Sequence, residues 1–292
     1  MRTNAVAATI LVSSLIPSLM PPPAEGAELV RVASTGHAVY YARRARDVDV
    51  RRSEAFLARL DSLFGPPPAG WRMQFYRHAS LAEVQERIGF PAWGVTDLVT
   101  GRVDSVRPYH PHELVHAAMG RIGQPPVFFA EGLAVALTSG GSWNGREMDA
   151  VAREFLAARG ELRDVVFVFA LTDPQRDYAL AGSFVGFLLD RYGIEPMLAF
   201  VQGCQEPGGC ARALPTAYGR PFPALEVEWA RALAEPRAPR PWYDAATWPA
   251  SLRGRAPLTH RQEPEGVPAA SPGLLAERAS APDHHLPDDG RP

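Results

Sequence analysis

The segment His112-Glu113-Leu114-Val115-His116 has the residue types and the spacing of a metal-dependent hydrolase site. Residues four apart on a helix lie on the same face, so His112 and His116 can share one metal ion. Glu113 would then lie beside the open position of the metal, where it can act as general base towards a water molecule. The pattern H-E-x-x-H therefore predicts a zinc site; the alternative is a solvated histidine pair on a surface helix.

A third metal ligand is predicted at Glu131, on a second helix that follows the proline-limited turn at Pro125-Pro126. Two histidines and one carboxylate leave the fourth tetrahedral position for water, as catalytic zinc requires. The neighbours of Glu131 are apolar, and an acidic side chain among them is destabilising unless something pairs with it. The alternative is a carboxylate that only stabilises a helix N-terminus. We predict His112, His116 and Glu131 as the ligands of Zn²⁺.

A hydrogen-bond donor to the developing oxyanion is the remaining requirement of such a site, and Tyr178 is the first candidate. Its hydroxyl can donate to that oxygen. Alternatively, Tyr178 only begins a core helix in which Phe184 and Phe187 are buried, and the residues leave both interpretations open. His110, two residues before the first ligand, is a second candidate, although a lone histidine beside a loop is more often structural or solvated.

These motifs resemble those of the gluzincins, and more narrowly those of the small bacterial peptidase-MA-like proteins. In that group an aromatic-x-x-Glu-Gly-x-Ala segment follows the zinc helix, and residues 128–134 match it here. Fourteen residues separate His116 from Glu131, which suits the compact members of the group. Residues 60–66, 178–193 and 225–229 also match the layout, so the resemblance covers residues 35–235.

The resemblance implies a zincin-like fold and cleavage of a peptide or protein substrate, with Glu113 as general base and a tyrosine or histidine as oxyanion donor. Larger relatives have an aspartate four residues after the ligand glutamate, which orients a ligand histidine; Val135 stands there in this chain. Two alternatives stay open: an inactive zinc-binding or interaction module, and a non-peptidase amidohydrolase. The intact Glu113 argues against the inactive module, because a structural metal site needs no base.

The elements expected to position these residues change in type along the chain. Residues 38–42 and 71–76 are predicted strands, and the intervening helix 53–64 has Ser53 as its expected cap. A helix at 80–88 and an extended segment at 94–106 complete a small mixed sheet unit. The pattern then becomes helical, with helices predicted at 112–119, 128–137, 146–159, 178–192 and 224–234. Strands first and helices after indicate an α+β fold whose helical half carries the site.

The composition bounds the domain organisation. The chain has 292 residues and is 46% hydrophobic, enough for a sizeable core, and its net charge of -2 gives no case for nucleic acid or an anionic membrane as partner. We predict a metallopeptidase domain at 28–235, with an α/β part at 28–106 and a helical part at 107–235. Residues 236–292 are rich in Pro, Ala and Arg and predict a mostly disordered tail, in which the aromatic stretch 241–248 can dock on the domain.

The N-terminus predicts export. Arg2 precedes an uncharged apolar run at residues 5–20, which is shorter than the roughly 20 residues of a membrane span, so residues 1–27 are predicted to be a signal peptide. The protein would then be periplasmic or extracellular without stable membrane insertion; an uncleaved anchor is the alternative. In an exported protein the two cysteines, Cys204 and Cys210, predict a disulfide across a turn-forming spacer, against the alternative of two reduced cysteines.

Overall fold

The computed structural model describes residues 28–205, 208–235 and Trp242 of the chain. The predicted signal peptide and all of the predicted tail except Trp242 lie outside the described residues. Trp242 is buried, with 3% of its surface exposed, in agreement with docking of the aromatic stretch. Among the described helices, none combines the length and the hydrophobicity that are needed to cross a bilayer.

A five-stranded mixed sheet forms the N-terminal half, in the strand order β1-β2-β3-β5-β4. Its strands are β1 (Val30–Ser34), β2 (Ala38–Ala42), β3 (Met73–Arg77), β4 (Gly94–Asp97) and β5 (Arg102–Ser105). The three central strands are parallel, whereas β1 and β4 are antiparallel to their neighbours and form the two edges. Tyr40, Phe75 and Val103 on the central strands are fully buried, as expected for a sheet with a covered face.

Two α-helices and a short 3-10 helix (Ala45–Asp47) accompany the sheet. Helix α1 (Val50–Phe64) begins at Asp49, whose side chain accepts a hydrogen bond from the Arg52 backbone N–H. The expected cap was Ser53; that residue is instead buried in the first turn, and its hydroxyl donates to the Asp49 carbonyl. Helix α2 (Leu81–Ile88) begins after the predicted Ser80 and ends at Gly89 in the left-handed conformation.

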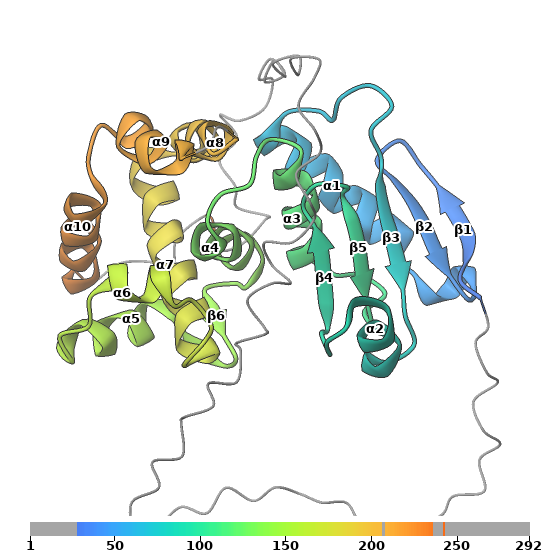
Figure 1. The fold of residues 1–292 in the computed structure, drawn as a ribbon, viewed down its shortest axis with the longest axis horizontal. Helices are drawn as coiled ribbons and strands as arrows, with labels where there is room; N and C mark the ends of the chain where they lie inside the picture. The colour runs from blue at the N-terminus through green and yellow to red at the C-terminus, as the bar shows by residue number, and fades with distance from the viewer. Residues whose placement is uncertain (1–27, 206–207, 236–241, 243–292) are drawn as a thin grey trace, which may run out of the picture.

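The C-terminal half is helical and contains one small hairpin. Its helices are α3 (Pro111–Gly120), α4 (Val127–Thr138), α5 (Met148–Ala157), α6 (Leu162–Phe167), α7 (Pro174–Tyr192), α8 (Ile194–Gly203), α9 (Gly209–Tyr218) and α10 (Phe222–Ala234), and its strands are β6 (Ser142–Trp143) and β7 (Arg146–Glu147). Figure 1 shows α7, α4, α3 and β4 side by side in that order, and each contacts the next. The two helices α3 and α4 therefore join the helical half to the sheet.

This arrangement confirms the predicted α+β class, a small mixed sheet followed by a helical half. Strand β1 was not predicted, and α6, α8 and α9 lie where the pattern predicts loops. The helix predicted from residue 146 begins at Met148, because residues 142–147 form the hairpin, with Asn144 and Gly145 at positive φ in its turn. The helix predicted from Tyr178 begins about one turn earlier, at Pro174, and the side chain of the capping residue Asp173 accepts a hydrogen bond from the Arg176 backbone N–H.

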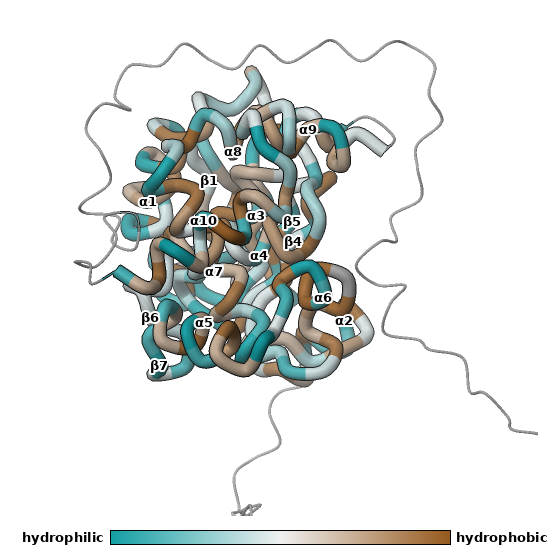
Figure 2. Tube along the Cα trace, turned by 90° about the vertical axis from the view of Figure 1, so that its left-hand side faces the viewer, coloured by the Kyte–Doolittle hydropathy of each residue, from teal (hydrophilic) through white to brown (hydrophobic). Residues whose placement is uncertain are grey.

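Helices α4 and α7 make the most extensive contact between two elements of the described chain, and glycine makes it possible. A Cβ on Gly132 would lie 2.6 Å from the Ala181 carbonyl oxygen, and one on Gly182 would lie 2.5 Å from Val135 Cγ1. The long helix α7 can therefore cover α4 closely, and most of α4 is buried. Figure 2 shows hydrophilic stretches, coloured teal, at α5 and the β6–β7 hairpin at the rim of this half.

Gly132→Ala is expected to lower the free energy of unfolding of the metal-free protein by about 1–3 kcal/mol, because the added methyl group overpacks the α4–α7 contact. Urea unfolding followed by circular dichroism measures this. Gly36→Ala is the matched control, since a Cβ there meets nothing within 4 Å. Equal unfolding free energies for the two variants would contradict the tight contact.

Candidate metal centre

Helix α3 places the two histidines on one face, one turn apart. Pro111 occupies the first turn of α3. Backbone N–H groups in the first turn of a helix have no acceptor within the helix, so a proline, which lacks this group, costs no hydrogen bond there. The rings of His112 and His116 lie 4.7 Å apart between centroids, and their Nε2 atoms are 3.1 Å apart. Both Nε2 atoms thus point towards the same place.

Helix α4 brings Glu131 to that place. Its Oε2 lies 2.9 Å from His112 Nε2 and 3.2 Å from His116 Nε2, so the three atoms form a nearly equilateral triangle. A tetrahedral zinc ion with bonds of about 2.0–2.2 Å holds its ligand atoms about 3.3–3.6 Å apart. The triangle needs to expand only slightly to accept such an ion, and its three residues are the group with metal-binding geometry in the described part of the chain.

The charges of this group favour a cation. Burial alone would raise the pKa of Glu131, but the adjacent His116 and His112 lower that pKa below its usual value. Burial lowers the pKa of His116, but the charge and the hydrogen bond of Glu131, together with the charge of Glu113, outweigh burial, so the pKa of His116 is raised. Two imidazole nitrogens and a carboxylate oxygen this close need protons or a metal between them, and a divalent ion satisfies all three at once.

His116 lacks the partner that ligand histidines usually have on the other ring nitrogen. Its Nδ1 is buried and has no hydrogen-bond partner among the described residues. Val135 stands where the larger members of the gluzincin family, whose motifs this chain resembles, often have an aspartate. On its Nδ1 side the ring of His116 is therefore held by packing rather than by a hydrogen bond.

Glu113 lies one residue after the first ligand and does not belong to the triangle. It is 5% exposed, and the Thr96 hydroxyl donates to its Oε2 over 2.7 Å. The other oxygen, Oε1, has no partner among the described residues, yet it is not among their fully buried unpaired atoms. One oxygen is thus anchored, and the other is unpaired and not fully buried.

Tyr178 lies next to the metal group, which is the set of His112, His116 and Glu131. The interpretation of Tyr178 as an oxyanion donor requires this position. Its ring stacks on Trp143 at 4.9 Å and lies 6.5 Å from the His112 ring. Burial, followed by the charges of Glu131 and Glu113, raises the pKa of the Tyr178 hydroxyl, so it stays protonated. That hydroxyl makes no hydrogen bond to another described residue. The later turns of α7 are buried as well, so the helix serves both the core and the site.

His110 is placed apart from the three converging ligand atoms. It is the residue before α3, 5% exposed, and its Nδ1 lies 2.9 Å from the Ser105 hydroxyl. Burial, followed by the charges of Arg107 and the two ligand histidines, lowers the pKa of His110 to about 3. A neutral, hydrogen-bonded His110 between sheet and helix fits a structural role.

Trp143 is a residue of the site that the sequence analysis did not predict. Besides stacking on Tyr178, its ring lies 6.3 Å from that of His112, so the β6–β7 hairpin forms one wall of the site. A cavity of about 550 Å³ lies beside it, lined by Trp143, Asn144, Arg146, Val151, Asp173, Gln175 and Arg176. The Asn144-Gly145 dipeptide is a typical two-residue hairpin turn and is the signal that could have predicted this wall.

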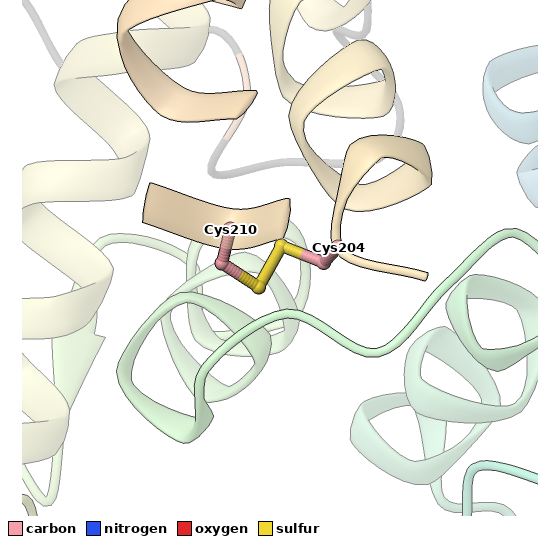
Figure 3. Close-up of a disulfide and its surroundings, with 2 residues drawn as sticks. All are labelled: Cys204 and Cys210. Atoms are coloured by element: carbon pink, nitrogen blue, oxygen red, sulfur yellow. A yellow bond between two sulfur atoms is a disulfide. The ribbon is translucent and has the colours of Figure 1, made fainter. Parts of the chain in front are cut away.

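The predicted disulfide between Cys204 and Cys210 is present and joins the end of α8 to α9 (Figure 3). It lies beside the loop that connects the two ligand helices. The side-chain amide of Gln205 donates to the Ile122 carbonyl, and Gly123 fits against the Val201 carbonyl with no room for a side chain. The bridged segment thus braces the α3–α4 connection.

Comparison with known proteins identifies no relative of this chain. No protein-family model matches the chain, and no curated protein matches it significantly. The function is therefore inferred from the geometry of the site and from its motifs.

We expect one divalent metal ion per chain, measured by elemental analysis of the purified protein. Changing His112, His116 or Glu131 to Ala should remove most of it, because a three-ligand site loses much of its affinity with any one ligand. His110→Ala is the control and should keep the metal. Stoichiometric metal in a folded Glu131→Ala protein would contradict the site, and His110 would then become the candidate third ligand.

Proposed function

We propose that the protein is a zinc-dependent hydrolase of the gluzincin type that cleaves peptide bonds. The observation that carries the proposal is the triangle of His112, His116 and Glu131, with sides of 2.9 to 3.2 Å, next to a glutamate that the metal does not need. A structural zinc site is closed by four protein ligands and needs no base. Glu113, with one anchored and one unpaired oxygen, supports a catalytic centre.

Zinc is the ion that this donor set favours. Imidazole nitrogens suit zinc and its transition-metal neighbours, whereas magnesium and calcium prefer oxygen donors throughout. Three protein ligands leave one tetrahedral position for a water molecule or for the substrate. When bound, zinc would lower the pKa of that water to about 7 and polarise the scissile carbonyl.

The residues of the chain supply the remaining steps. Glu113 accepts the proton of the attacking water at Oε1 and delivers it to the leaving amine. Tyr178 donates its hydroxyl hydrogen to the oxygen on which negative charge develops, and its raised pKa keeps that hydrogen available. Trp143 stacks on Tyr178 and restricts the positions that the phenol ring can take.

A peptide is the substrate that the surroundings of the site favour. Strand β4 forms the edge of the described sheet, and its Thr96 contacts Glu113, so an unpaired strand edge runs beside the base. An extended peptide can bind such an edge through backbone hydrogen bonds. The disulfide is compatible with an exported protein, and we propose a periplasmic or extracellular location.

Glu113→Gln should retain one zinc per chain and lose nearly all peptide hydrolysis, because the amide keeps the shape of the side chain but cannot accept the proton. Activity is measured on a mixed library of fluorogenic peptides. Glu154→Gln changes an exposed carboxylate on α5 and is the control that should cleave normally. Near-full activity in Glu113→Gln would refute the enzymatic reading and favour a zinc-binding module.

Tyr178→Phe should lower kcat by roughly 100- to 1000-fold with little change in KM, the usual effect of losing one oxyanion donor. Tyr192→Phe is the matched control, because it removes a phenol hydroxyl that donates to Glu228 at the far end of the same helix. Unchanged turnover in Tyr178→Phe would leave its hydroxyl without a catalytic role, and His110 would become the alternative donor.

A further inference from the structure

We infer that Thr96 is a positioning residue that fixes the orientation of the Glu113 carboxylate, and that strand β4 is therefore part of the catalytic machinery. This inference rests on the proposed function of Glu113 as general base. Thr96 lies in the middle of β4, on the sheet, whereas Glu113 is in α3. Nothing in the H-E-x-x-H pattern points to this threonine.

The contact itself is short and enclosed. The Thr96 Oγ1 lies 2.7 Å from Glu113 Oε2 and 3.1 Å from the Glu113 carbonyl oxygen, and both residues are 5% exposed. A threonine hydroxyl has one hydrogen to donate. The shorter distance and the negative charge of the carboxylate assign that hydrogen to Oε2, because hydrogen bonds to charged acceptors are the stronger ones.

The hydrogen bond matters because a glutamate carboxylate has no preferred rotation of its own. Its last torsion is broad, so either oxygen, in a range of orientations, could face the attacking water. With Oε2 held by Thr96, Oε1 is left as the oxygen without a partner among the described residues. A base that is already oriented needs no rearrangement when the water arrives, and such alignment contributes strongly to rate.

A second residue of the same strand acts on the same side chain. Gly94 precedes Thr96 by two positions, so both face the same side of the sheet, towards α3. A Cβ at Gly94 would lie 2.8 Å from Glu113 Cγ and would collide with the His110 ring. Gly94 thus permits the close approach of the strand, and Thr96 uses it to hold the carboxylate.

The test replaces the hydroxyl and then restores it. Thr96→Val keeps the shape and the strand preference of threonine but cannot donate, so kcat should fall about 10- to 100-fold while KM changes by less than about threefold. Zinc content should stay at one per chain. Thr96→Ser restores the hydroxyl and should recover kcat to within about threefold of the wild type. The reporter is the library peptide that the wild-type protein cleaves fastest.

Thr100→Val is the matched control. Its hydroxyl also donates to a carboxylate over 2.7 Å, that of Asp97, but in the exposed turn after β4. This variant should keep wild-type kcat. The inference is overturned if Thr96→Val turns over within about threefold of the wild type, if Thr96→Ser fails to recover, or if Thr100→Val falls as far.

Crystal structures of the zinc-loaded wild type and Thr96→Val separate this inference from the proposed function. A Glu113 carboxylate that rotates or becomes disordered in Thr96→Val, together with the loss of kcat, supports the positioning role, and an unchanged carboxylate overturns it. Should Thr96→Val not fold, Gly94→Ala is the second variant, because its added methyl group displaces Glu113 without removing a hydrogen-bond donor. A loss of kcat with zinc retained then supports control of the base by β4. Wild-type kcat in Gly94→Ala overturns it. Failure of the proposed function shows separately, as undiminished cleavage by Glu113→Gln.

Discussion

The closeness of His112, His116 and Glu131 is the constraint on which the rest of the structure depends. Two nitrogen lone pairs and a carboxylate oxygen lie within 3.2 Å of one another, partly removed from water, and without a cation or protons they would repel. The two histidines share a helix, so their spacing is local. Glu131 belongs to another helix, and its position depends on how firmly α4 is held against α3. The packing of α4 is therefore part of the site.

Helices α3 and α4 are held from two sides, by α7 on one side and by the sheet on the other. On one side α7 approaches α4 through Gly132 and Gly182, and the same helix brings Tyr178 to the site. On the other side α3 lies against β4, which contacts Glu113. The sheet thus holds the proposed base, and the helical half holds the third ligand and the proposed oxyanion donor. The residues of the metal group lie in the helical half, where it meets the sheet, and the sheet contributes Thr96 of β4.

The sequence predicted what depends on local spacing and missed what depends on tertiary contacts. His112, Glu113 and His116 follow from one helical turn, and the α+β class follows from the order of the patterns. Trp143 was missed because the segment before the predicted helix 146–159 was not recognised as a hairpin, although Asn144-Gly145 signals one. Thr96 carries no local signal at all, because its role depends on a strand that meets a helix only in the folded chain.

The unpartnered Nδ1 of His116 shows how the site differs from one built on hydrogen bonds. Where a carboxylate orients a ligand histidine, the ring keeps its direction even if the packing around it relaxes. In the described part of this chain, His116 has no such partner, and on its Nδ1 side the ring is held by packing alone. Small movements of α3 against α4 should then reach the metal ligands directly. The connection between these helices is braced by Gln205, next to Cys204, and by the close contact of Gly123 with α8. The disulfide therefore lies next to the connection between α3 and α4.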